Sequence, residues 1–262
     1  NNKGDTKKLF FQKIDDSTTP VSMVSDLGIN VLIHDYNVSD DSRWVVFRAQ
    51  PNVDYPPHLY RFDLNAASSM VDLATNIDSF KIAPNAYQNQ RVVYATGEQL
   101  FSVKLDGSLT TPLWITPSDL KTYTTTPDGV YTVFSAILTA DSTRILRAIP
   151  TAGGGYYEIA NLPDGTTIGT YGFTPDSERI VYLADHDGDE HKDLFSDRPT
   201  AGDLVMVNGA LVSGGDVFSF AISPDGQRIV YRADQEVDFK YELFSTTHAG
   251  DGRIVSRPPP AR

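Results

Sequence analysis

The sequence predicts an all-β fold, a β-propeller built from four-stranded blades. One observation is a turn motif that recurs five times, with copies starting at positions 39, 83, 126, 174 and 223. The spacings of 44, 43, 48 and 49 residues match the length of one propeller blade and exceed that of leucine-rich or β-helix repeats. The other is that no window of helix length keeps apolar residues at i, i+3, i+4 and i+7.

The turn motif has a physical basis that predicts a hairpin. Segments Thr174–Tyr182 and Ser223–Tyr231 align residue for residue, each starting with Ser or Thr, then Pro and Asp, and ending in an apolar run. Proline presets φ for the first central position of a turn, and aspartate accepts hydrogen bonds from the amides that follow it. The second copy, Ala83–Tyr94, has lost most of the motif but keeps the apolar run.

A second pair of strands is expected in each repeat. The segments that predict its first strand are Leu59–Leu64, Leu100–Leu105, Asp193–Phe195 and Glu242–Ser245. The distances from Ala49 to Tyr60, Ala184 to Phe195 and Ala233 to Phe244 are all 11 residues, so the hairpins share one frame. The aromatic residues of the apolar runs are expected to pack between sheets; they are Phe47, Tyr94, Phe134, Tyr182 and Tyr231.

The repeats predict one propeller domain over residues 1–256. The expected repeats are 36–79, 80–122, 123–170, 171–217 and 218–256, and residues 8–26 align with the outer half of a further blade. Five blades of four strands and one half blade of two give 22 strands. A six-bladed ring with one incomplete blade is favoured, and a five-bladed ring with an extra hairpin is the alternative. The Pro-rich tail, 257–262, is typical of a linker in polyproline conformation.

Composition excludes several classes of function. The 262 residues carry 34 acidic and 22 basic side chains and a net charge of -12, so a nucleic acid partner is not expected. No cysteine is present, which excludes thiol nucleophiles, thiolate metal sites and redox switching. The apolar runs are far shorter than the roughly 20 residues that span a bilayer, so membrane insertion is not expected either.

The turn and the apolar strand after it resemble the TolB-type, WD-like β-propeller repeat of bacterial proteins. The resemblance covers residues 36–256 and is strongest in the last two repeats. It implies a secreted or periplasmic protein of the bacterial envelope and a chain that is part of a larger protein. Propellers of this family serve as protein-docking platforms, as gates over peptidase sites and occasionally as lyases.

The lack of a recognisable catalytic constellation in the sequence favours a non-enzymatic binding or scaffold module that presents its loop face to a protein or glycan partner. The alternative is a propeller-based enzyme, a polysaccharide lyase, or the gating propeller of a peptidase. The sequence contains no Gly-x-Ser-x-Gly elbow. Its five histidines are scattered over strand ends and loops, at His34, His58, His186, His191 and His248, so no catalytic residue is assigned. Gly153–Gly155 is interpreted as a turn, and Tyr55–His58 as a possible exposed contact patch.

The acidic segment Asp185–Asp193 is the most distinctive local feature. Alternating carboxylates in a Gly-containing loop are typical of ligands for a hard cation, so Ca²⁺ is the one cofactor considered. The candidate metal ligands are Asp185, Asp187, Asp189, Glu190 and Asp193. The EF-hand pattern is not met, because glycine is at the fourth position and Ser196 at the twelfth. The equivalent loops Asp234–Asp238 and Gln50–Asp54 favour the alternative, an ordinary solvated hairpin with extra charge.

Overall fold

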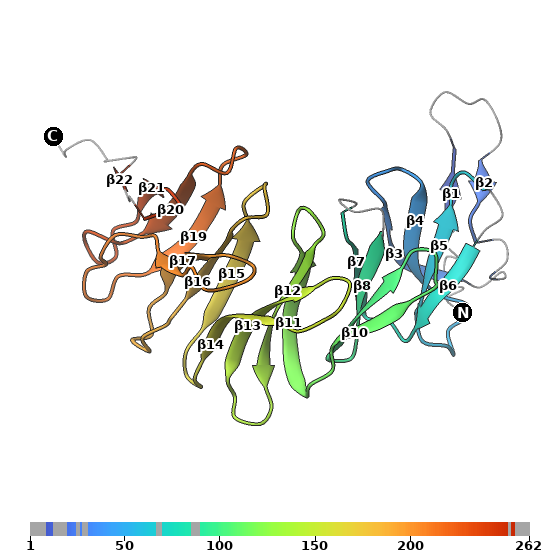
Figure 1. The fold of residues 1–262 in the computed structure, drawn as a ribbon, viewed down its shortest axis with the longest axis horizontal. Coiled ribbons are helices and arrows are strands. Elements are labelled where there is room, and N and C mark those ends of the chain that lie inside the picture. Colours follow the sequence, from blue (N-terminus) through green and yellow to red (C-terminus); the bar gives the residue numbers. More distant parts are fainter. Residues whose placement is uncertain are drawn as a thin grey trace, which may run out of the picture. The chain divides into compact units, whose positions relative to one another are not determined.

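The chain is all-β, as the sequence predicts (Figure 1). The computed structural model describes residues 9–12, 20–24, 27, 31–66, 70–84, 90–250 and 253–254. These residues form five four-stranded antiparallel sheets and one two-stranded sheet, with no α-helix among them. The part of the chain described here also contains no helix with the length and hydropathy of a membrane span.

Each four-stranded sheet is a meander in which consecutive strands are neighbours. The two-stranded sheet pairs β1 (Phe10–Phe11) with β2 (Val21–Ser22). Sheet 1 contains β3 (Leu32–Val38), β4 (Trp44–Gln50), β5 (His58–Asp63) and β6 (Met70–Thr75). Sheet 2 contains β7 (Ser79–Ile82), β8 (Arg91–Thr96), β9 (Gln99–Lys104) and β10 (Thr110–Trp114). Sheet 3 contains β11 (Ser118–Thr125), β12 (Tyr131–Leu138), β13 (Arg144–Pro150) and β14 (Tyr157–Leu162). Sheet 4 contains β15 (Ile168–Phe173), β16 (Ile180–Ala184), β17 (Asp193–Asp197) and β18 (Val205–Met206). Sheet 5 contains β19 (Val217–Ile222), β20 (Ile229–Ala233), β21 (Glu242–Thr246) and β22 (Arg253–Ile254).

The sheets begin a few residues before the repeats expected from the sequence. The expected boundaries at 122/123 and 170/171 fall inside β11 and β15. The turn motif that marks each repeat follows the first strand of its sheet. The sheet therefore begins several residues before the motif. The β1–β2 pair lies within residues 8–26, where a half blade is expected. The blade number of the ring stays a prediction, and the tail 257–262 lies outside the described residues.

The repeated turn is closed by the Ser or Thr hydroxyl at its start, which donates one hydrogen bond and accepts another. The Thr174 hydroxyl donates to Asp176 Oδ1 at 2.5 Å and accepts the Arg179 amide at 3.0 Å. The Asp176 Oδ1 atom also accepts the Glu178 amide at 3.0 Å. The same three bonds recur in the turns that begin at Ser39, Thr126 and Ser223. Each turn therefore closes through its own side chains before the apolar strand begins.

Successive turns in sheets 3, 4 and 5 contact one another. The Asp128 amide donates to Ser177 Oγ at 2.9 Å. A Cβ placed on Gly226, whose φ is +72°, would lie 3.2 Å from Cδ of Pro175. A larger residue at position 226 would therefore meet both an unfavourable backbone conformation and a close neighbour. These turns form a packed edge of the sheets.

The chain divides into two compact units, residues 1–115 with 151–153 and residues 116–150 with 154–262. In the second unit, Val133 and Leu146 of sheet 3 pack against Tyr182 and Phe195 of sheet 4. Sheet 4 packs in the same way on Tyr231 and Phe244 of sheet 5; the contributing residues of sheet 4 are Val181, Leu183 and Leu194. In the first unit, sheet 1 packs on sheet 2 through Trp44, Val46 and Leu59, and its other face packs on Met23 and Val24 beside β2.

Four of the aromatic residues lie in packing layers, as the sequence predicts: Tyr94, Tyr182 and Tyr231 between neighbouring sheets, and Phe47 against Met23 and Val24 beside β2. Phe47, Phe134 and Tyr182 are 0% exposed, Tyr231 is 1% and Tyr94 is 6%. In four sheets the aromatic residue stacks on the aromatic ring of the next strand, as Tyr182 does on Phe195 with centroids 5.7 Å apart. Pairs of this kind add to the free energy gained by burial.

One position of the repeat differs at the last sheet. Leu59, Leu146 and Leu194 occupy equivalent places in the third strands of sheets 1, 3 and 4, each is 0% exposed, and each is covered by the sheet that follows in the same unit. The equivalent residue of sheet 5, Leu243, is 45% exposed. The outer face of sheet 5 thus carries a core-type residue in contact with solvent.

Candidate functional site

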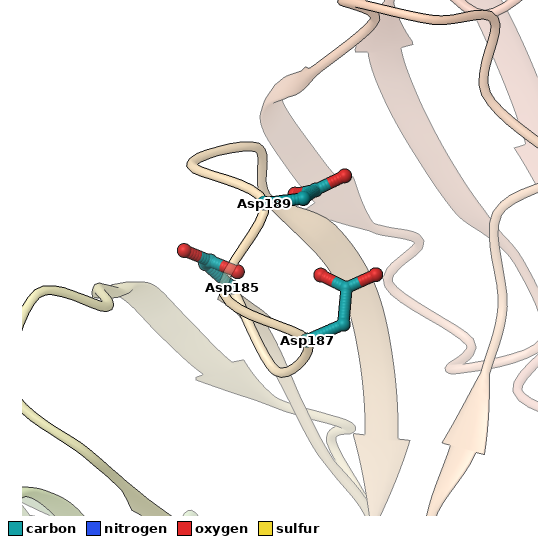
Figure 2. Close-up of side chains that lie close together, drawn as sticks. All are labelled: Asp185, Asp187 and Asp189. Atoms are coloured by element: carbon teal, nitrogen blue, oxygen red, sulfur yellow. The ribbon is translucent and has the colours of Figure 1, made fainter.

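The hairpin loops between the second and third strands lie at the edge opposite the packed turns. The loop between β16 and β17 contains the acidic segment, and Figure 2 shows Asp185, Asp187 and Asp189 projecting from it. One carboxylate oxygen of each of these residues lies within 4.8 Å of one of each of the others. Two ligands of one Ca²⁺ ion are at most about 4.6–5.2 Å apart, because Ca–O distances are about 2.3–2.6 Å. The three carboxylates are therefore close enough to share a cation.

Asp185 is fixed by the loop backbone. It is 2% exposed, its Oδ1 accepts the Gly188 amide at 2.7 Å, and its Oδ2 accepts the Glu190 amide at 3.2 Å. Asp187 and Asp189 are exposed. The loop backbone is therefore fixed through Asp185, and one oxygen of each exposed carboxylate, Asp187 and Asp189, lies within 4.8 Å of it.

The other two candidate ligands are not part of this trio. Glu190 contributes its amide to Asp185 and has a left-handed φ of 73°. Asp193 begins β17, where its Oδ1 accepts a hydrogen bond from Asn208 Nδ2 at 2.7 Å. Burial raises the pKa of Asp193, and the charges of Asp187, Asp189 and Asp216 raise it further. Asp193 is thus electrostatically coupled to the acidic loop although its carboxylate is engaged elsewhere.

The five histidines do not form a common site among the described residues. His34 contacts Gln50 and His58 contacts Asp72, both within sheet 1. His186 packs on Phe195 with ring centroids 4.3 Å apart, and burial lowers its pKa. Asp185, Asp187 and Asp189 are the one trio of His, Asp or Glu in the described part of the chain with metal-site spacing.

A chain of hydrogen bonds connects the loops of sheets 4 and 5. The Lys192 amide donates to Asp216 Oδ1, the Asp216 amide donates to Asp234 Oδ1, and the Phe239 amide donates to Asp234 Oδ2. Lys192 Nζ also donates to Asp216 Oδ2 at 3.0 Å. The backbone of the β20–β21 loop is therefore fixed while its tip projects into solvent.

Two equivalent loop tips display apolar side chains. In the β4–β5 loop, Val53 is 80% exposed and Tyr55 is 55% exposed. In the β20–β21 loop, Val237 is 52% exposed and Phe239 is 81% exposed. Each Val stands four residues after the alanine of the shared frame, Ala49 or Ala233, and each aromatic residue stands six after it. The sequence singled out Tyr55 but not Phe239; aligning the two loops on their alanines would have found it.

No family model and no curated protein matches the chain. Solved structures do match. Oligogalacturonate lyase from Vibrio parahaemolyticus is similar over 98% of this chain and 73% of that chain, with 15% identity and a TM-score of 0.57. Oligopeptidase B from Leishmania major is similar over 95% of this chain and 37% of that chain, with 9% identity and a TM-score of 0.57.

The fold is a β-propeller fold. A putative TolB from Agrobacterium tumefaciens is also matched, over 85% of this chain and 80% of that chain, with 14% identity and a TM-score of 0.46. At these identities the likeness concerns the fold and leaves the chemistry of the loops to the residues themselves. The propeller architecture predicted from the sequence is thus confirmed.

Proposed function

We propose that this chain is a non-enzymatic binding module that presents propeller loops to a protein partner. The observation that supports it most is the repeated pair of exposed apolar residues, Val53 with Tyr55 and Val237 with Phe239. Aromatic side chains of this kind contribute a large share of the binding energy in protein interfaces. Because Asp54, Glu236 and Asp238 lie in the same loops, the complementary partner is a surface with apolar pockets and basic residues at their rim.

The TolB-type resemblance suggests where the protein acts, and the exposed loop residues suggest which classes of partner it binds. We propose a secreted or periplasmic site of action in the bacterial envelope and a chain that belongs to a larger protein. A glycan is the second partner class, since exposed aromatic rings also stack on apolar ligand faces. The propeller-based lyase and the peptidase gate remain the alternatives for function.

The acidic loop adds a candidate cation site to this module. We propose that Asp185, Asp187 and Asp189 bind Ca²⁺ weakly, supported by the 4.8 Å spacing of their oxygens. Affinity on the order of 0.1 to 1 mM is expected, because the loop closes through Gly188 and Glu190 without an ion.

The test of the binding module uses a double variant and a matched control. The chain is immobilised and exposed to a bacterial envelope extract, with bound proteins identified by mass spectrometry. Tyr55→Ser with Phe239→Ser should lose the partner, whereas Tyr36→Ser, which removes a 61% exposed tyrosine from strand β3, should keep it. Equal recovery by the double variant would contradict a role for the loop tips. Release of unsaturated sugars from an acidic polysaccharide by the wild-type chain would support the lyase instead.

A further inference from the structure

A cavity of about 260 Å³ opens between sheets 3 and 4 in the second unit. The residues that define its chemistry are Lys121, Ser135, Arg144, Ile145, Thr167 and Ile168. They come from β11, β12, β13 and the start of β15, so the cavity lies at the same edge as the Ile137–Arg144 hairpin. Its wall adjoins the start of the acidic loop, because the Thr167 carbonyl accepts the Asp185 amide at 2.9 Å.

Two strand irregularities lie at the wall of the cavity. In β11 the register shifts between Leu120 and Thr122, so Lys121 is an extra residue in a β-bulge. In β15 the register shifts between Ile168 and Tyr171. Bulges bend a strand and turn a side chain in a new direction, and they occur often beside binding sites. Lys121, at the first shift, and Ile168, at the second, both line the cavity.

The charge of this wall differs from that of the rest of the protein. Two cations, Lys121 and Arg144, line the cavity and no acidic residue does, in a chain whose net charge is -12. The residue that opens the third strand is Arg144 in sheet 3 but Asp193 in sheet 4 and Glu242 in sheet 5. The positive charge is therefore specific to this blade.

Both cations retain donors for a ligand. Arg144 Nη1 donates to Asp164 Oδ1 at 2.9 Å and to the Ser142 carbonyl at 3.3 Å, while its Nε and Nη2 make no hydrogen bond within the described part of the chain. Lys121 Nζ donates to Asp119. Asp119 and Asp164 are 52% and 68% exposed, and ion pairs with such exposed carboxylates are weak. A second carboxylate can therefore be accommodated.

We propose that this cavity binds a small organic carboxylate, with the carboxylate at Lys121 and Arg144 and the apolar part against Ile145 and Ile168. Ser135 and Thr167 supply hydroxyls for a further polar group. Because a water molecule occupies about 30 Å³ of the liquid, the cavity accommodates roughly nine non-hydrogen atoms.

The test compares benzoate with benzamide, which has the same shape but no charge, by two-dimensional NMR titration of the full chain at 0.15 M salt. Benzoate should bind with a dissociation constant on the order of 1 mM and shift the amides near Lys121, Arg144 and Ile168, and benzamide should bind at least about ten times more weakly. Arg144→Gln and Lys121→Met should each weaken benzoate binding several-fold or more, whereas Lys81→Met on exposed β7 should not.

The benzoate and benzamide comparison needs no variant, so it remains decisive if a substitution disturbs folding. Equal binding of the two compounds would overturn the proposal. So would shifts confined to residues away from the cavity, or the absence of shifts at about 20 mM benzoate.

Discussion

Sheets 4 and 5 are near copies that differ in two places. Their turns, Thr174–Tyr182 and Ser223–Tyr231, make the same hydrogen bonds, and their buried aromatic residues stack in the same way. They differ at the outer face, where Leu194 is 0% exposed and Leu243 is 45% exposed. They also differ in the hairpin loop, which carries Asp185, Asp187 and Asp189 in sheet 4 and exposes Val237 and Phe239 in sheet 5. The shared positions build the blade, and the differences lie in the outer face and in the hairpin loop.

The largest expected effect is a difference in stability between alanine variants of Leu194 and Leu243. Leu194→Ala should lower the free energy of unfolding by about 2–5 kcal/mol, because it leaves a cavity between sheets 4 and 5. Leu243→Ala should cost less than about 1 kcal/mol, because the side chain is already half in water. Urea unfolding of both variants measures the difference. Equal costs would mean that another sheet covers Leu243 in solution and would end the distinction between the two faces.

The turns should behave alike in the two sheets. Thr174→Val removes the hydroxyl that bonds Asp176 and the Arg179 amide, and should cost about 1–2 kcal/mol at pH 7. The hydroxyl of Thr174 lowers the pKa of Asp176 below its ordinary value. That part of the stability is present above about pH 4 and is lost as the pH falls, so the cost of the substitution should shrink in acid. Ser223→Ala is the matched change in sheet 5, and a neutral result for both would contradict the role of the hydroxyl.

Calcium should distinguish the two hairpin loops. At 1 mM Ca²⁺ the wild-type chain should gain about 0.4–1.4 kcal/mol, given a dissociation constant between about 0.1 and 1 mM. The variant Asp187→Asn with Asp189→Asn should gain nothing, while Glu236→Gln with Asp238→Asn in the sheet 5 loop should respond as the wild type does. Calorimetric titration and thermal unfolding report both quantities. Identical behaviour of wild type and the sheet 4 variant would leave the acidic loop as a solvated hairpin.

The smallest effect concerns Asp193, which has its pKa raised by burial and by neighbouring carboxylates. A raised carboxyl pKa means that ionisation opposes folding above about pH 4. Asp193→Asn should therefore raise the melting temperature at pH 7 slightly, and the gain should vanish below about pH 4. Asn keeps an oxygen that accepts from Asn208. Asp203→Asn is the control of opposite sign, because hydrogen bonds from Arg179 and Arg198 lower the pKa of Asp203.

The sequence predicted the blade and missed the details that set its surfaces. The turn motif and apolar runs were sufficient because their spacing repeats and their hydrogen bonds are local. The third strand of sheet 3 escaped notice because Arg147 stands where the other sheets have an aromatic residue, paired with Phe134 in register. Its guanidinium is neutralised by Glu158 and packs on Tyr156, which no spacing rule anticipates.

The candidate site was predicted only in part, for a similar reason. Five carboxylates in nine residues indicated an acidic loop, but the backbone conformation decides that Asp185, Asp187 and Asp189 converge while Asp193 turns to Asn208. The cavity beside Lys121 is lined at two register shifts that leave no mark in composition or periodicity. Both features arise from chain geometry beyond the nearest neighbours in sequence.

Because successive turns contact each other, the two edges of the second unit should differ in their tolerance of inserted residues. At Gly226 and at the Asp128 to Ser177 bond, one turn fits against the next, so an inserted residue there would disturb two blades at once. At the opposite edge the ends of the hairpins are joined through Lys192, Asp216 and Asp234, while the loop tips project into solvent. Foreign peptides could therefore be inserted at the exposed tip of the β20–β21 loop, around Val237, with little loss of stability. The second unit therefore has one edge whose turns are packed against each other and one edge whose loop tips can accept an inserted sequence.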